Sequence, residues 1–111
     1  MTNKQAVTVL GGGSFGTAIA SIAADNDYPV TQWLRDEQLA DDINTKRRNT
    51  RYLPDYPINA NVRATTDVVS AVSGADIIFV AIPSKAFAQV VDQVADQLRP
   101  DQIMISTAKG I

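Results

Sequence analysis

Two residue types with versatile side-chain chemistry are absent from this chain, since none of its 111 residues is cysteine or histidine. Without cysteine, neither a disulfide nor a thiolate metal site can form within the chain. Without histidine, the chain supplies no histidine general base, no Ser-His-Asp triad and no histidine metal cluster. We therefore expect no metal site, and any proton transfer by this chain would fall to Lys, Asp, Glu or Tyr.

Long apolar runs are missing as well. No run approaches the roughly 20 residues that a membrane-spanning helix needs, and residues 1–7 show no hydrophobic signal-peptide core. The net charge is only −2, so we expect neither nucleic acid nor a membrane surface as a partner. With 45% hydrophobic and 20% charged residues, the sequence predicts one soluble domain over residues 1–111, located in the cytoplasm.

A glycine-rich junction near the N-terminus is the most informative segment that is present. The β-branched run at 7–10 leads into GGGSFG at 11–16, and small apolar residues follow at once. This is the spacing of the dinucleotide-binding fingerprint G-x-G-x-x-G. Gly11 would permit the tight turn, Gly13 would let a pyrophosphate approach the backbone, and Gly16 would let the helix pack closely on the strand. We predict a dinucleotide site here; the alternative is a glycine-rich turn that binds nothing.

Strand and helix patterns alternate along the chain. We predict strands at 6–10, 29–34, 62–65, 75–82 and 102–107, and helices at 14–25, 36–46, 68–72 and 84–98. The pattern predicts an α/β fold, a doubly wound, mainly parallel sheet of Rossmann type with the glycine turn at its centre. The connection at 47–61 is long enough to suggest a functional loop, and we expect Tyr52 and Leu53 to pack onto the domain.

Arg35 and Asp36 follow the second predicted strand, where such sites distinguish NAD from NADP. Arg35 could hold a 2′-phosphate with two hydrogen bonds or stack on the adenine, which favours NADP as the cofactor. Asp36 leaves NAD open, because a shift of one residue would exchange the two roles. Arg35 could also simply begin a solvated loop.

Two further candidates follow later strands. Pro83 closes the fourth predicted strand, where the nicotinamide end of a cofactor would lie, although with Ser84 it is as typical of an ordinary helix start. Lys109 follows the last strand and could bind an anionic substrate or polarise a carbonyl; the alternative is an exposed lysine. Because the chain stops soon after that strand, we expect it to be the first domain of a longer, two-domain protein.

Taken together, these segments resemble the bacterial-type NAD(P)-dependent glycerol-3-phosphate dehydrogenases. The similar segments are VLGGGSFGTAIA at 9–20, TQWLR at 31–35, INTKRRNTRYLPD at 43–55, ATTD at 64–67, ADIIFVAIPS at 75–84 and STAKGI at 106–111. They occur in order and at the spacing of the family. The combination of NxRYLP with TxKG is much more specific than the glycine motif.

The resemblance implies hydride transfer between NAD(P)H and dihydroxyacetone phosphate, giving sn-glycerol 3-phosphate for phospholipid synthesis. It implies cofactor contacts at Ser14, Phe15, Arg35 and Lys109, and substrate contact at Lys109. The family's catalytic lysine and most of its substrate-phosphate ligands belong to a second, helical domain that nothing in this chain matches. We therefore expect no catalytic residue in this chain and no activity from this chain alone. Assembly of the protein into a homo-oligomer is compatible with the sequence.

Two other interpretations remain. The chain could be a stand-alone dinucleotide-binding or redox-sensing module without catalysis. It could also come from another dehydrogenase with a similar first domain, such as a relative of ketopantoate reductase or hydroxyacyl-CoA dehydrogenase, although RYLP and TAKG argue against this.

Overall fold

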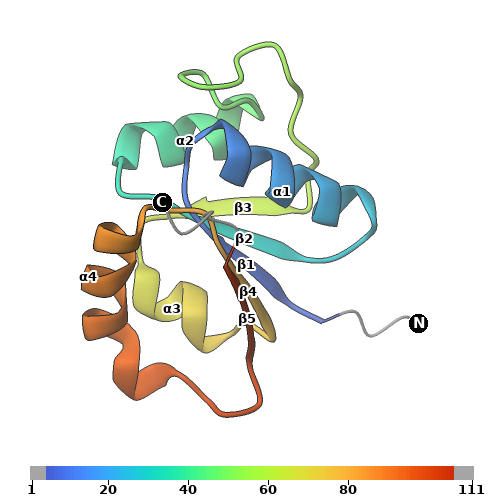
Figure 1. Cartoon of the computed structure of the whole chain (residues 1–111). Helices are drawn as coiled ribbons and strands as arrows, with labels where there is room; N and C mark the ends of the chain where they lie inside the picture. Colours follow the sequence, from blue (N-terminus) through green and yellow to red (C-terminus); the bar gives the residue numbers. More distant parts are fainter. Residues whose placement is uncertain (1–4, 107–111) are drawn as a thin grey trace.

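Five parallel strands form one sheet, in the order β3-β2-β1-β4-β5 (Figure 1). The computed structural model describes residues 5–106. The strands are β1 (Val7–Leu10), β2 (Val30–Trp33), β3 (Val62–Thr65), β4 (Ile77–Val80) and β5 (Ile103–Ser106). All four pairings between neighbours are parallel. The predicted doubly wound α/β sheet is therefore confirmed.

Helices cover the sheet from two sides, as Figure 1 shows. The helices are α1 (Ser14–Asp25), α2 (Glu37–Lys46), α3 (Val68–Ser73) and α4 (Ser84–Val94), with a short 3-10 turn η1 (Ala95–Gln97) after α4. One apolar core lies between the sheet and α1 and α2, and includes Val9 and Ile43. A second core lies between the sheet and α3 and α4, and includes Ile78 and Val90. Apolar side chains on both faces are what a parallel sheet requires.

Strand β1 is the centre of the sheet. All four of its residues are buried, and Val7 pairs with Val30 of β2 on one side and with Ile77 of β4 on the other. The chain winds outward from β1 through β2 to β3 and then returns to β4 on the opposite side. The direction therefore reverses beside the carboxyl end of β1, where the glycine turn follows, as the sequence predicts.

The observed helices and strands differ from the predicted ranges only at their ends. Asp36 is the N-cap residue of α2, and its side chain accepts a hydrogen bond from the Leu39 backbone N–H. Asp67 is the N-cap residue of α3, and its side chain caps that helix in the same way. Strand β4 is shorter than the predicted 75–82. Ala75 is fully buried although it precedes the strand. The apolar run at 75–82 therefore marks a buried segment that extends beyond the strand itself.

The long loop at 47–61 differs from expectation in one respect. The predicted packing of Tyr52 is wrong: its side chain is 48% exposed, while Leu53 is only partly buried. The residues that anchor the loop are instead Asn49 and Ile58, both buried. Asn49 Oδ1 accepts hydrogen bonds from the backbone N–H groups of Arg51 and Tyr52, so this part of the loop is held through its backbone.

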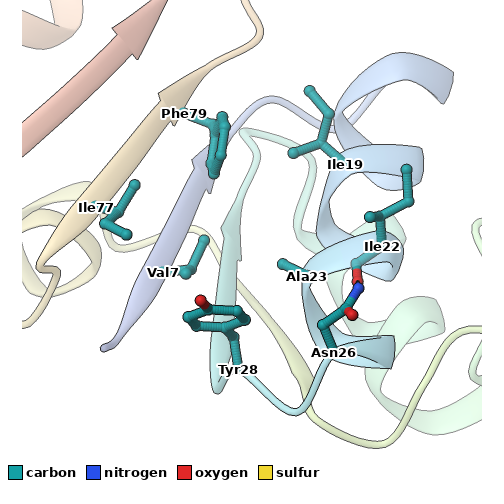
Figure 2. A pocket seen from close by; sticks show the side chains of 8 residues that line it. All are labelled: Val7, Ile19, Ile22, Ala23, Asn26, Tyr28, Ile77 and Phe79. Carbon is teal, nitrogen blue, oxygen red and sulfur yellow. The ribbon is translucent and has the colours of Figure 1, made fainter. Parts of the chain in front are cut away.

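One part of the sheet carries an apolar hollow instead of a covering helix. Beside α1, a cavity of about 590 Å³ separates Ile19 and Ile22 from Phe79 of β4 (Figure 2). Ile105 of β5 is in register with Phe79 and therefore points to the same face, where it is 39% exposed. Among residues 5–106, no helix is long and apolar enough to cross a membrane.

Candidate functional site

The glycine turn at the end of β1 leaves no room for a Cβ at Gly11 or at Gly16. Gly11 has φ +141°, and its N–H donates to the carbonyl of Trp33 at 2.8 Å. A Cβ on Gly11 would lie 2.6 Å from the carbonyl oxygen of Ala81, and one on Gly16 would lie 2.6 Å from the carbonyl oxygen of Gly11. The predicted roles of these two residues in the turn and in close packing agree with this geometry.

Gly13 occupies a different environment, because a Cβ added there meets no atom of the described residues within 4 Å. It is the N-cap of α1, and no side chain caps that helix. Ser14 and Phe15, the next two residues, are exposed, with Phe15 at 58%. The first-turn N–H groups of a helix have no intrahelical partner and attract anions. The open space over Gly13 is therefore a cradle for a negatively charged group.

A buried polar network beneath the turn escaped the sequence analysis. The Gln32 side-chain amide donates to the Gly11 carbonyl at 2.9 Å and to Thr17 Oγ1 at 3.0 Å. The Asn49 side-chain amide donates to the Gly12 carbonyl at 2.9 Å and to the same Thr17 hydroxyl at 2.8 Å. All three side chains are fully buried. The one local sign is Gln32, a polar residue in an apolar strand.

A cavity of about 200 Å³ lies beside the turn, between the end of β2 and the long loop. It is lined by Gly12, Gly13, Leu34, Arg35, Asp36, Leu39, Arg51 and Tyr52. Arg35 is exposed, its guanidinium donates to Gln89 Oε1 at 3.1 Å, and it lies 6.0 Å from the centre of the Trp33 ring. Arg35, the predicted site residue that follows β2, thus borders the cavity. Its guanidinium is directed toward α4.

Asp36 and Arg51 form an ion pair in this cavity, with 2.6 Å between Asp36 Oδ2 and Arg51 Nη2. The hydrogen bond from the Leu39 backbone N–H has the largest effect and lowers the pKa of the Asp36 carboxyl. Desolvation comes next and opposes it, while the hydrogen bond and the charge of Arg51 lower the pKa further. Asp36 is therefore a charged group with a partner on each oxygen. This pairing was not predictable from the sequence, because Asp36 precedes α2 and Arg51 belongs to the loop that follows it.

Pro83 lies at the same end of the sheet, as the N-cap of α4. Two residues earlier, the N–H of Ala81 donates to the carbonyl of Leu10 at 2.8 Å, which holds the end of β4 beside the end of β1. Pro83 therefore follows β4 at the same edge of the sheet as the glycine turn, but it does not line the cavity beside that turn. Lys109 lies outside the described residues.

Comparisons with known proteins bear on what this site does. The family model described as the NAD-dependent glycerol-3-phosphate dehydrogenase N-terminus matches residues 6–111. A curated glycerol-3-phosphate dehydrogenase (NAD(P)+) from Saccharophagus degradans is 49% identical over 111 residues, which are 100% of this chain and 31% of that protein.

Two solved structures agree with this. A glycerol-3-phosphate dehydrogenase from Saccharomyces cerevisiae has a TM-score of 0.86 at 31% identity, covering 94% of this chain and 33% of that one. One from Coxiella burnetii has a TM-score of 0.85 at 28% identity, covering 93% and 32%. The chain thus spans about a third of the length of the relatives it matches. Because the family model covers nearly all of it, this chain belongs to the family of NAD-dependent glycerol-3-phosphate dehydrogenase N-termini.

Proposed function

We propose that this chain is the dinucleotide-binding domain of an oxidoreductase that transfers hydride between NAD(P)H and dihydroxyacetone phosphate, giving sn-glycerol 3-phosphate. The observation that carries the proposal is the uncapped N-terminus of α1 behind Gly13, where a Cβ would meet no atom of residues 5–106 within 4 Å. A pyrophosphate needs this kind of space and these free N–H groups. The relatives, which are named as dehydrogenases, favour this function over a stand-alone sensor module.

The cofactor would lie across the carboxyl ends of the strands. Gly11 and Gly16 shape the turn, Gly13 admits the pyrophosphate, and the backbone N–H groups of Ser14 and Phe15 bind it. The adenosine end would enter the cavity beside Arg35, which favours NADP over NAD because a guanidinium pairs with the additional phosphate. The nicotinamide, which supplies or accepts the hydride, would lie toward Pro83.

Catalysis needs more than this chain provides. The carbonyl of the substrate needs a proton donor as its oxygen becomes an alkoxide, and the substrate phosphate needs cationic ligands. We assign Lys109 to cofactor and substrate contact, and no residue of this chain to catalysis. Residues 1–111 would form one dinucleotide-binding domain, and the remaining two thirds of the relatives' length would supply the rest of the site.

We also propose the wider setting of this reaction. The product is a precursor of phospholipids, and both substrate and product are small molecules, so the enzyme would act in the cytoplasm without nucleic acid or a membrane as a partner. A homo-oligomer is compatible with this proposal.

Titration of NADPH and NADH into wild type and the Arg35→Ala variant tests the cofactor assignment. A charge-assisted contact contributes about 1.5–3 kcal/mol, so NADPH should bind at least ~10-fold more weakly to the variant, and NADH should change less. Arg48→Ala is the matched control, since Arg48 is exposed and does not line the cavity. Equal losses for the two cofactors would remove the 2′-phosphate role and leave adenine stacking.

An NADPH-oxidation assay with dihydroxyacetone phosphate tests whether this chain binds the cofactor while the rest of the protein completes the active site. We expect no turnover by the 111-residue chain, and turnover by a chimera in which the rest of the Saccharophagus degradans relative follows it. In that chimera, Lys109→Ala should lower both activity and substrate affinity while the melting temperature stays unchanged. Substantial turnover by the chain alone would contradict the proposal.

A further inference from the structure

Asp36 lies shortly after β2, in the region where an acid ordinarily accepts hydrogen bonds from the ribose of NAD. Here its two carboxylate oxygens are already engaged. Oδ1 accepts from the Leu39 backbone N–H at 3.1 Å, and Oδ2 lies 2.6 Å from Arg51 Nη2. The carboxylate that would repel a 2′-phosphate is therefore held as a helix cap and paired with a cation.

Arg51 reaches Asp36 from the long loop rather than from α2. The buried side chain of Asn49 accepts a hydrogen bond from the Arg51 backbone N–H at 3.2 Å, while its amide group donates to the Gly12 carbonyl. The loop is thus attached to the glycine turn two residues before Arg51. This attachment places the Arg51 side chain in the same cavity that Arg35 borders.

The balance of charge in the cavity then depends on Arg51. With Arg51 present, Asp36 is neutralised and Arg35 adds a positive charge, so a doubly charged phosphate meets a favourable field. Without Arg51, Asp36 keeps the helix-cap hydrogen bond on Oδ1 but presents an unpaired negative charge and a free Oδ2, which suit the unphosphorylated ribose of NAD.

We propose that Arg51 determines cofactor specificity by masking Asp36, so that the cavity admits the phosphorylated ribose of NADP(H). The inference rests on the proposed function, because it assumes that the adenosine end of a dinucleotide occupies the cavity.

Binding titrations of NADPH and NADH to wild type, Arg51→Met and the double variant Arg51→Met/Asp36→Asn test the masking. The single variant should bind NADPH at least ~10-fold more weakly and NADH with unchanged or higher affinity. The double variant should recover NADPH binding to within about threefold of wild type, since its neutral amide needs no mask. Asparagine caps a helix as well as aspartate does, so α2 should stay intact.

Arg48→Met is the matched control, because Arg48 belongs to the same loop, donates to the Pro54 carbonyl at 3.3 Å and does not line the cavity. Its affinities for both cofactors should equal those of wild type. Thermal melts of all variants report folding, and Arg51→Gln replaces Arg51→Met if the latter unfolds.

The outcomes separate the two proposals. If wild type binds neither dinucleotide, the proposed function fails. If wild type binds both and Arg51→Met weakens both equally, the masking is refuted while the proposed function stands. A loss of NADPH binding that Asp36→Asn does not rescue would make Arg51 a direct phosphate ligand and would also overturn the masking.

Discussion

Glycine serves two separate purposes within the turn at 11–16. At Gly11 and Gly16 an added Cβ would collide with a backbone oxygen at 2.6 Å, so these residues allow the chain to pack. At Gly13 the space is open, so the missing Cβ benefits only a ligand. Gly12, to which the sequence motif assigns no role, is also required, because its Cβ would lie 2.7 Å from Leu34 Cβ.

Substitution by alanine should separate these purposes. Gly16→Ala forces backbone apart in a buried turn and should cost about 1–3 kcal/mol of unfolding free energy, measured by urea denaturation. Gly13→Ala should cost less than about 1 kcal/mol, because only an N-cap preference is lost. Even so, Gly13→Ala should weaken NADPH binding at least ~10-fold. Wild-type affinity in Gly13→Ala would show that no pyrophosphate approaches that residue.

The carboxyl group of Asp42 has a lowered pKa, which predicts that the unfolding free energy depends on pH. Hydrogen bonds from Thr50 and Gln38 and the charge of Lys46 lower the pKa of its carboxyl below 3.8, with the Thr50 hydroxyl contributing most, although desolvation opposes them. A carboxyl whose pKa is lower in the folded state stabilises the protein above its unfolded pKa, and the effect fades as pH falls through the folded pKa.

We therefore expect wild type to lose more unfolding free energy than Asp42→Asn when urea titrations move from about pH 5 to pH 3. Glu37→Gln, at an exposed position on the same helix, serves as the control. Parallel pH curves for wild type and Asp42→Asn would contradict the expectation.

At the scale of elements, the long loop is a structured part of the site. Arg47 ends α2 in a left-handed conformation with φ 55°, and its guanidinium donates to the carbonyls of Asn59 and Val62, the latter at 2.8 Å. Asn49 then fastens the loop to the glycine turn and to Thr17. The two ends of the loop and its contact with the site are thus fixed by side-chain hydrogen bonds.

Asn49→Ala should release this contact. The change leaves buried groups without partners, and each such group costs about 1–3 kcal/mol. Hydrogen exchange should speed up in the loop, and NADPH binding should weaken. Asn44→Ala is the matched control: it breaks two hydrogen bonds between α2 and Ala64 of β3 and should lower stability without loosening the loop. Loosening of the loop to the same extent in both variants would mean that Asn49 has no special role.

Local patterns predicted most helices and strands because their causes are local. Asp36 and Asp67 cap helices through backbone groups three residues away, and the glycine turn follows its strand directly. The buried network was not predictable in this way, since Thr17 receives hydrogen bonds from residues 15 and 32 positions away. The prediction that Tyr52 packs onto the domain was wrong for a related reason. An aromatic ring suggests burial, but the contact that holds this part of the loop is the hydrogen bond from the Tyr52 backbone N–H to Asn49, and the ring stays exposed.

For the whole molecule, a group of exposed apolar side chains lies beside the open face of β4 and β5. Ile103 and Ile105 are in register with Ile77 and Phe79, which line the apolar cavity of Figure 2. An exposed apolar area of this kind binds other apolar surfaces.

We expect an apolar fluorescent dye to bind the folded chain at neutral pH, and Ile103→Thr/Ile105→Thr to reduce the fluorescence while changing unfolding free energy by less than about 1 kcal/mol. Met104→Thr is the control on the same strand, because Met104 pairs with Ile78 on the opposite face. A larger loss of fluorescence in the control would place the dye elsewhere.

The central position of β1 has a consequence for the order of events during synthesis. Its partner β2 leaves the ribosome soon after it, but its other partner belongs to a segment 70 residues away, as the hydrogen bond from Ala6 to Asp76 shows. One edge of β1 must therefore stay unpaired until the residues of β4 have been made. Pulse-labelled refolding should protect the amides of β2 and β3 before those of β4 and β5, so that the nascent chain carries an open β1 edge until β4 arrives.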